Sequence, residues 1–95
     1  MSTLRIDAHQ HLWQIARGEY GWLTPALGPI HRDFTPDDLA PVLARHGIDR
    51  TILVQAAPTE AETRFLLDIA ARTAFVAGVV GWTDLEAPDA PARIA

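Results

Sequence analysis

An acid and two histidines alternate near the start of the chain, within the segment IDAHQHLW at residues 6–13. Side chains two residues apart on a strand point the same way, so Asp7, His9 and His11 are expected on one face. The Cα atoms of the two histidines would lie about 6.6 Å apart, close enough for both imidazoles to bind one divalent ion. Asp7 would then either orient one of the imidazoles as a hydrogen-bond acceptor or steady the end of the strand.

Two histidines do not complete a metal site, because zinc takes three or four protein ligands. His9 and His11 are therefore either the first two ligands of a divalent metal, with zinc as a candidate, or a polar strand end with solvated or hydrogen-bonded rings. Other chemistry has little support. The chain has no Cys, a single Ser at position 2, no Gly-x-Ser-x-Gly motif and no glycine-rich phosphate loop.

Polar or aromatic residues also close two later predicted strands. Residues 51–55 form a nearly continuous apolar run, typical of a parallel strand covered on both faces, and residues 74–82 form another. Gln55 and Trp82 end these runs, and parallel strands end at the rim where α/β enzymes place reactive groups. Both are therefore candidate substrate contacts. The alternatives are that Gln55 bonds loop backbone and that Trp82 only packs.

Two helices are predicted between the strands, and each has a recognisable start. Residues 35–38, TPDD, place an N-cap before a proline and two acids, and Gly47 is positioned to end this helix. Pro41 predicts a short first turn and then a restart, because an internal proline removes a hydrogen bond. Residues 59–62, TEAE, form a capping box, and residues 88–95 look like the opening of another helix.

The segment from residue 12 to residue 34 is too long for an ordinary connection, which favours a functional or lid-like loop. Its aromatic residues are either anchors packed on the scaffold or platforms that stack on a sugar, namely Trp13, Tyr20 and Trp22. His31 in this loop is either a substrate contact or a solvated residue. His46, beside Gly47, is expected to interact with the carbonyls at a helix C-terminus.

The predicted order is strand, long loop, helix, strand, helix, strand and incipient helix, with the first strand near residues 4–8. This is a βαβαβ series whose parallel strands require right-handed crossovers. Three strands and two helices leave two bare sheet edges and incompletely covered faces. We therefore expect residues 1–95 to be one incomplete domain, the N-terminal part of a larger α/β protein. The alternative is a self-sufficient three-stranded domain.

Composition sets the class of protein. Apolar residues make up 48% of the chain and charged residues 21%, as in soluble globular proteins. The eight basic residues are all Arg, and twelve acids give a net charge of -4, which argues against nucleic acid or an anionic membrane as partner. No cysteine calls for an oxidising compartment, and the longest apolar run is too short to span a bilayer. We expect a cytoplasmic protein.

Collinear blocks over nearly the whole chain resemble the amidohydrolase-related metal-dependent hydrolases, in the branch of sugar-lactone hydrolases such as L-fuconolactonase and L-rhamnonolactonase. Beyond IDAHQHLW, the blocks are YGWL at 20–23, RDFTPDDLAPVLARHGID at 32–49, VQAAPTEAET at 54–63 and GVVGWTDLEAP at 78–88. The resemblance implies a TIM (β/α)₈ barrel of about 250 residues or more, of which this chain supplies about the first three β/α units.

The resemblance also implies hydrolytic opening of a sugar lactone. A divalent metal held by His9 and His11, or the histidine pair itself, polarises the lactone carbonyl while a base-activated water attacks it. Gln55 and Trp82 are the implied substrate contacts. The catalytic base and further histidines are expected from later strands, so residues 1–95 alone are expected to be inactive.

Three alternatives to the lactonase assignment stay open. Two are enzymes of the same superfamily, an amide hydrolase and a decarboxylase, which differ from a lactonase in the later strands. The third is a non-catalytic fragment that binds a partner or self-associates through its exposed sheet edges.

Overall fold

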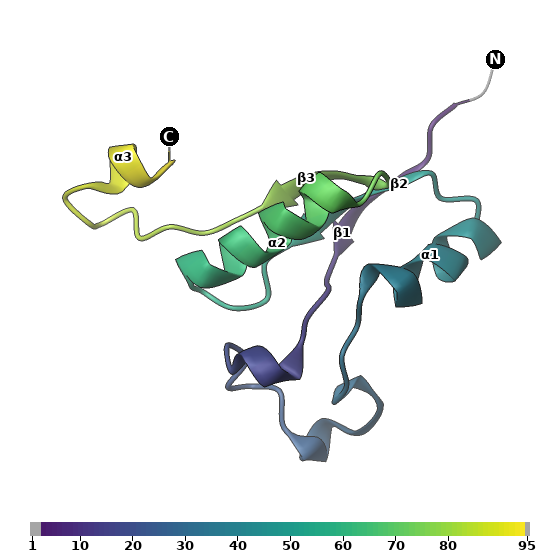
Figure 1. Cartoon of the computed structure of the whole chain (residues 1–95), viewed down its shortest axis with the longest axis horizontal. Helices are drawn as coiled ribbons and strands as arrows, with labels where there is room; N and C mark the ends of the chain where they lie inside the picture. The colour runs from purple at the N-terminus through teal and green to yellow at the C-terminus, as the bar shows by residue number, and fades with distance from the viewer. Residues whose placement is uncertain (1–2, 95) are drawn as a thin grey trace.

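Three parallel strands form the centre of the computed structural model, which describes residues 3–94 (Figure 1). They are β1 (Ile6–Gln10), β2 (Arg50–Val54) and β3 (Val76–Val80), and their order in the sheet is β1-β2-β3. Both neighbouring pairs are parallel, as predicted. The first strand lies two residues later than expected, and the third ends two residues before Trp82.

The predicted helices are present, two of them in the connections between the strands and the third after β3. They are α1 (Pro36–Arg45), α2 (Glu60–Arg72) and the short α3 (Ala90–Ile94). The long segment after β1 contains two 3₁₀ helices, Ile15–Arg17 and Pro25–Ile30, and loops well away from the sheet before it returns to α1 (Figure 1). No helix within residues 3–94 has the length and apolar character needed to cross a membrane.

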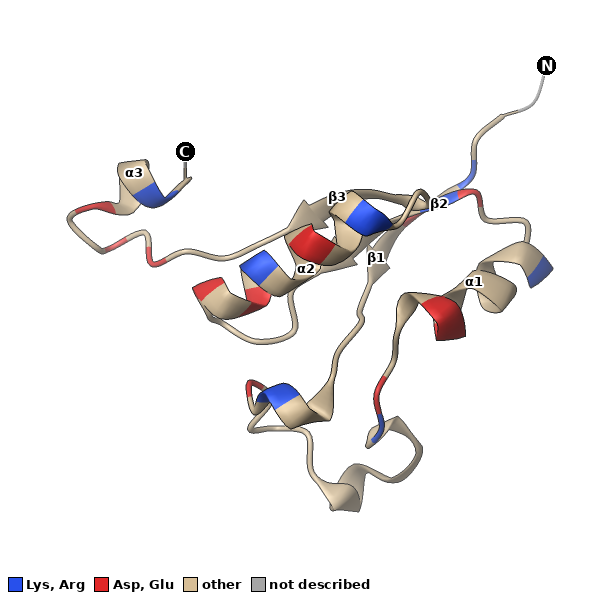
Figure 2. Ribbon diagram, in the orientation of Figure 1, with Lys and Arg blue, Asp and Glu red and all other residues tan. Residues whose placement is uncertain are grey.

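Charges follow the dipoles of α1 and α2, with acidic residues at their starts and an arginine in the last turn (Figure 2). At the start of α1, the Asp38 carboxylate accepts the Thr35 backbone N–H at 2.9 Å and its hydroxyl at 3.0 Å. These two bonds, with the nearby Arg32 guanidinium, hold the pKa of Asp38 below its usual range. Gly47 follows α1 with a φ of 66°, the left-handed conformation that ends helices.

Pro41 does not interrupt α1, so the predicted restart of the helix at this residue is wrong. The helix runs unbroken through Pro41. The proline removes the hydrogen bond to the Asp37 carbonyl, but both residues lie on the exposed side of the helix. Water can therefore bond the freed carbonyl, which lowers the cost of the proline.

The main core lies between the sheet and one layer of helices. Buried apolar side chains from the long loop, both main helices and the sheet form it, namely Leu12, Leu39, Leu43, Leu53, Leu66, Ile69 and Val76. Thr51 and Leu53 of β2 are fully buried, whereas Ile52 and Val54 on its other face are only half-buried. The incompletely covered face predicted for three strands and two helices is therefore present among residues 3–94, because α1 and α2 cover the same face, and the covering of β2 on both faces that its apolar run suggested is not complete.

Candidate active site

The two predicted metal ligands lie side by side at the C-terminal end of β1. The imidazole centroids of His9 and His11 are 4.9 Å apart, and the rings meet edge to face at 74°. His9 is exposed and His11 is half-buried. The arrangement places two imidazoles at the rim of the sheet where β2 and β3 also end, within reach of a small ligand.

His11 has a defined tautomer. Its Nδ1 lies 2.9 Å from the carbonyl oxygen of Val54, the last residue of β2. A carbonyl only accepts hydrogen bonds, so Nδ1 carries the proton and donates it. In the neutral ring Nε2 then holds a lone pair, the form of histidine that binds metals while its other nitrogen bonds a backbone carbonyl. His11 therefore fits the role of a divalent-metal ligand.

Of the two roles predicted for Asp7, the structure shows the one at the strand end and not the orientation of an imidazole. Its carboxylate accepts the backbone N–H of His9 at 3.1 Å and the side-chain amide of Gln10 at 2.8 Å. The pairing of β1 with β2 shifts register between Asp7 and Gln10, which interrupts the simple alternation assumed from the sequence. Asp7 therefore stabilises the irregular end of β1 and leaves the orientation of His11 to the Val54 carbonyl.

Gln55 and Trp82 line one hollow of about 360 Å³ at the ends of β2 and β3. The Gln55 amide is nevertheless engaged by its surroundings: its nitrogen donates to the carbonyls of Ala57 and Thr59, and its oxygen accepts the Thr63 hydroxyl at 2.5 Å. These bonds match the alternative in which Gln55 holds loop backbone. Trp82 remains 41% exposed and open to a ligand.

Thr63 is a residue of the rim that sequence reasoning missed. Its hydroxyl oxygen accepts the backbone N–H of Trp82 at 3.0 Å and also bonds Gln55. It thereby ties the end of β2 to the end of β3 from the first turn of α2. The sequence placed Thr63 on the helix, four residues after the N-cap Thr59. Its contact with Trp82 joins residues 19 positions apart, so no local sequence pattern indicates it.

We expect Gly81→Ala to lower stability by about 1–3 kcal/mol, because a Cβ there would lie 2.6 Å from Thr63 Cγ2. The clash would push Thr63 away from Gln55 and Trp82. Gly21→Ala is the matched control, since nothing lies within 4 Å of its added Cβ and its φ is not positive. Urea denaturation followed by tryptophan fluorescence checks both; equal midpoints for the two variants would contradict the expected clash.

Glu62 is fully buried and joins the long loop to the rim. Its carboxylate accepts hydrogen bonds from the Arg17 guanidinium at 2.5 Å, the Tyr20 hydroxyl at 2.7 Å and the Ala56 backbone N–H at 3.2 Å. Burial raises the pKa of the Tyr20 hydroxyl, and the Glu62 carboxylate adds to this effect. The predicted capping box is half right: Thr59 accepts the Glu62 N–H, but the Glu62 side chain turns inward.

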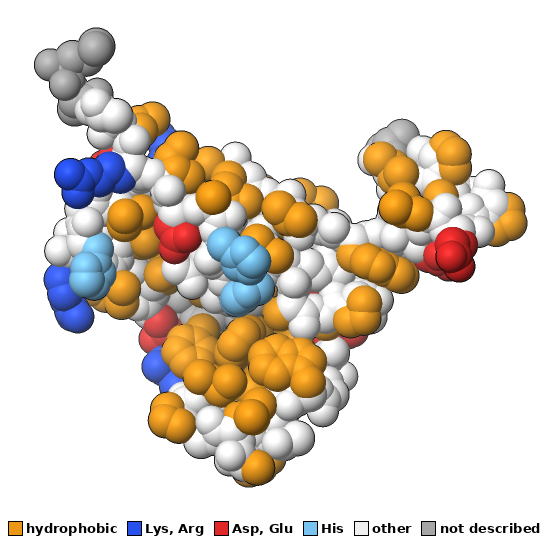
Figure 3. All heavy atoms as spheres, turned by 180° about the vertical axis from the view of Figure 1, so that it is seen from behind, with side chains coloured by type: hydrophobic (Ala, Val, Ile, Leu, Met, Phe, Trp, Pro, Cys, Tyr) orange, Lys and Arg blue, Asp and Glu red, His pale blue; other side chains and the backbone are white. Residues whose placement is uncertain are grey.

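The aromatic residues of the long loop divide into buried anchors and one exposed ring. Trp13 and Tyr20 are 9% and 6% exposed, and the Trp13 indole donates to the Arg32 carbonyl at 2.7 Å. Both are therefore anchors. Trp22 is 46% exposed. On the face of the molecule that shows the neighbouring histidines, hydrophobic side chains gather directly beside them (Figure 3).

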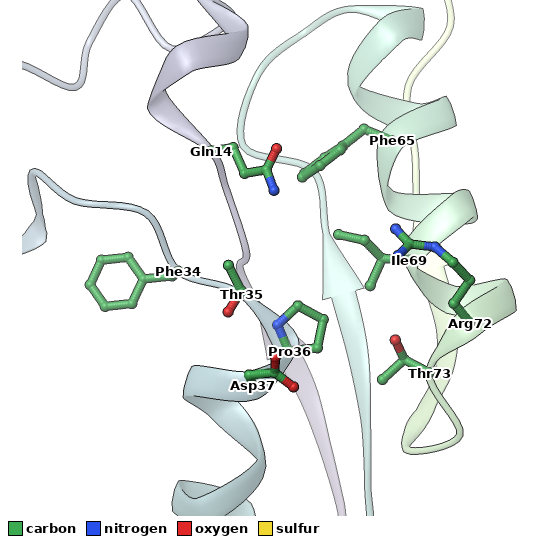
Figure 4. A pocket seen from close by; sticks show the side chains of 9 residues that line it. All are labelled: Gln14, Phe34, Thr35, Pro36, Asp37, Phe65, Ile69, Arg72 and Thr73. Carbon is green, nitrogen blue, oxygen red and sulfur yellow. The ribbon is translucent and has the colours of Figure 1, made fainter.

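A second hollow, of about 330 Å³, lies between the start of α1 and the second half of α2 (Figure 4). Its lining includes Asp37, Phe65 and Arg72 but none of the four predicted site residues. The rim at the strand ends is thus the better candidate. Among residues 3–94, no three His, Cys, Asp or Glu side chains come together around one point, so a metal at the histidines would need further ligands.

A comparison with models of known protein families shows to which family this chain is related. The amidohydrolase family model matches residues 6–95, which is nearly the whole chain and includes both histidines. The chain belongs to the amidohydrolase family. The resemblance seen in the sequence blocks is thereby confirmed.

Two curated relatives of this amidohydrolase chain are L-fucono-1,5-lactonases. The protein from Burkholderia ambifaria is 58% identical over 93 residues, and the one from Burkholderia multivorans is 42% identical over 95 residues. The matches cover 98% and 100% of this chain but only 32% of each relative. The amidohydrolase chain described here therefore spans about a third of the length of these relatives.

A solved structure confirms the fold class. The crystal structure of an amidohydrolase from Burkholderia multivorans with bound zinc matches with a TM-score of 0.89 and 41% identity, over 97% of this chain and 32% of its own. A second crystal structure, with bound HEPES, matches equally well. The α/β sheet of this chain corresponds to the N-terminal part of a TIM-barrel amidohydrolase.

Proposed function

We propose that these residues form part of a hydrolase that opens a sugar lactone ring by attack of water, with L-fucono-1,5-lactone as the first substrate to test. The observation that carries the proposal is the histidine pair at the rim, in which the Val54 carbonyl fixes His11 with Nε2 free beside His9. Two relatives named as L-fucono-1,5-lactonases, one of them 58% identical, support the substrate class.

In this proposal His9 and His11 hold a divalent ion, and the zinc in the related crystal structure supports that choice. When bound, such an ion polarises a carbonyl oxygen and lowers the pKa of water. His11 contributes Nε2 as a ligand, because its Nδ1 proton is committed to Val54. The remaining ligands and the catalytic base would come from residues beyond this segment.

The residues at the other strand ends shape the substrate site. Trp82, exposed over the hollow at the ends of β2 and β3, contacts the substrate. Gln55 holds the loop after β2 through its bonds to Ala57 and Thr59 and so supports the rim from behind. Both Nε2 hydrogens are engaged in these bonds, so donation of a hydrogen bond from Gln55 to the substrate would require one of them to break.

A chimaera tests the function without assuming where the natural protein ends. Residues 1–95 replace the matching segment of the Burkholderia ambifaria L-fucono-1,5-lactonase, with which they share 58% identity. The chimaera is assayed on a panel of aldonolactones, on simple amides and for decarboxylation of an aromatic acid. We expect selective hydrolysis of six-membered aldonolactones. A folded chimaera that acts on the amide or the acid, and not on the lactones, would refute the proposal.

The isolated chain serves as the second arm of this experiment. It is assayed on the same aldonolactones at the same concentration, together with circular dichroism and size-exclusion chromatography. We expect no lactone hydrolysis, since among residues 3–94 no third ligand stands near the histidine pair. Turnover by residues 1–95 at a rate close to that of the chimaera would contradict this expectation.

A further inference from the structure

We propose that Trp22 is a substrate-binding residue that stacks on the ring of the sugar lactone, an inference that rests on the proposed function for the identity of the ligand. Trp22 belongs to the long loop and is not part of the strand ends. Its side chain is 46% exposed, whereas the neighbouring Trp13 and Tyr20 are buried. An isolated exposed apolar residue needs no explanation, so the inference depends on how this ring is held.

The Trp22 ring is fixed to the rim of the sheet. Its indole Nε1 donates a hydrogen bond of 2.9 Å to the carbonyl of Ala56, two residues beyond the end of β2. The same Ala56 residue donates its backbone N–H to the buried Glu62 carboxylate at 3.2 Å. Trp22 is therefore attached to a backbone segment that is itself held from the interior, which limits the freedom of the indole.

Trp22 is also connected to the histidine pair through Trp13. The Trp13 ring lies 6.5 Å from the His11 ring, with 29° between the planes, and 5.3 Å from the Trp22 ring, edge to face at 84°. The three rings form one continuous aromatic series that starts at the candidate ligand His11. Trp22 is the tryptophan of this series whose surface remains exposed, and Trp13 alone separates its ring from that of His11.

The chemistry of this surface suits one face of a sugar ring. Because the only polar atom of the indole is satisfied by Ala56, what remains exposed is apolar and electron-rich. The ring C–H groups of an aldonolactone form an apolar patch that packs on such a π face. The hydroxyl groups at the ring edge stay free for water or polar residues. Trp22 would thus hold the lactone ring while His9 and His11 face its carbonyl.

The test uses the chimaera carrying Trp22→Ala, Trp22→Phe or the control Leu85→Ala, which truncates another exposed apolar side chain. Binding of a six-membered sugar lactam, which keeps the ring but resists hydrolysis, is measured by calorimetry, and lactone turnover is measured alongside. We expect Trp22→Ala to raise the lactam Kd and the lactone KM about tenfold with little change in kcat. Trp22→Phe, which keeps an aromatic face, should lie within about threefold of the parent.

The outcomes separate this inference from the proposed function. A lactam Kd that is the same in Trp22→Ala, Leu85→Ala and the parent would overturn the role of Trp22, even if the chimaera hydrolyses lactones. A parent that binds the lactam through Trp22 but hydrolyses no lactone would overturn the proposed reaction and leave Trp22 as a sugar contact. Circular dichroism of each variant confirms that a loss of binding is not a loss of folding.

Discussion

Replacing His11 with alanine is expected to lower lactone hydrolysis by the chimaera at least about 100-fold and to remove most of its bound divalent metal. The imidazole is held by the Val54 carbonyl at the end of the neighbouring strand, so its Nε2 occupies a defined place at the rim. Alanine removes the ligand without disturbing the main core, because His11 is only half-buried. Both kcat/KM and zinc content per chain are measured.

His9→Ala is expected to give a similar loss of metal, since its ring lies 4.9 Å from that of His11 and would share the same ion. His46→Ala is the matched control, because His46 is an exposed histidine that caps the C-terminus of α1. It should leave both metal content and turnover unchanged. If His9→Ala and His11→Ala each retained parental zinc content and kcat/KM, the histidine pair would not be the metal site.

The elements that follow from local patterns could be predicted from the sequence. The apolar run that became β2 and the caps at Thr35 and Thr59 depend on residues within a few positions of one another, and all three appear in the structure. The closeness of the His9 and His11 rings was also local, because the two residues are only two positions apart. The parallel pairing of the three strands could be predicted because helices connect them.

Features set by pairing between distant segments could not be predicted in the same way. Which of its two predicted roles Asp7 takes depends on the register of β1 against β2, which shifts between Asp7 and Gln10. The Trp22 contact to Ala56 joins residues 34 positions apart, and no periodicity reports such a bond. Pro41 was misjudged for a different reason: its cost depends on whether the freed carbonyl meets water, which is a property of the folded surface.

Glu62→Ala is expected to lower the free energy of unfolding by about 3–5 kcal/mol, the second large effect that the structure implies. The carboxylate is fully buried. Its removal would leave the Arg17 guanidinium without its carboxylate partner, and the Tyr20 hydroxyl and the Ala56 N–H without an acceptor. In the sequence, Glu62 was interpreted as a capping residue. Its buried ion pair could not be predicted, because the partner Arg17 is 45 positions away. The measurement is urea denaturation of the chimaera.

A double-mutant cycle separates the ion pair from the other contacts of Glu62. Because a single truncation leaves the partner charge unpaired, Arg17→Ala combined with Glu62→Ala should cost less than the sum of the single variants, by about 1–3 kcal/mol. Asp68→Ala is the control on the same helix. Its ion pair with Arg72 joins side chains that are 69% and 66% exposed, so its loss should barely move the denaturation midpoint.

The Glu62 network also predicts a functional consequence that a purely structural ion pair would lack. Since Glu62 holds the Ala56 backbone that anchors the Trp22 indole, Glu62→Ala should raise the lactam Kd in the same direction as Trp22→Ala. Combining the two substitutions should then raise that Kd little beyond Trp22→Ala alone, because both remove the same contact. Fully additive effects on Kd would show that Glu62 does not act on binding through Trp22.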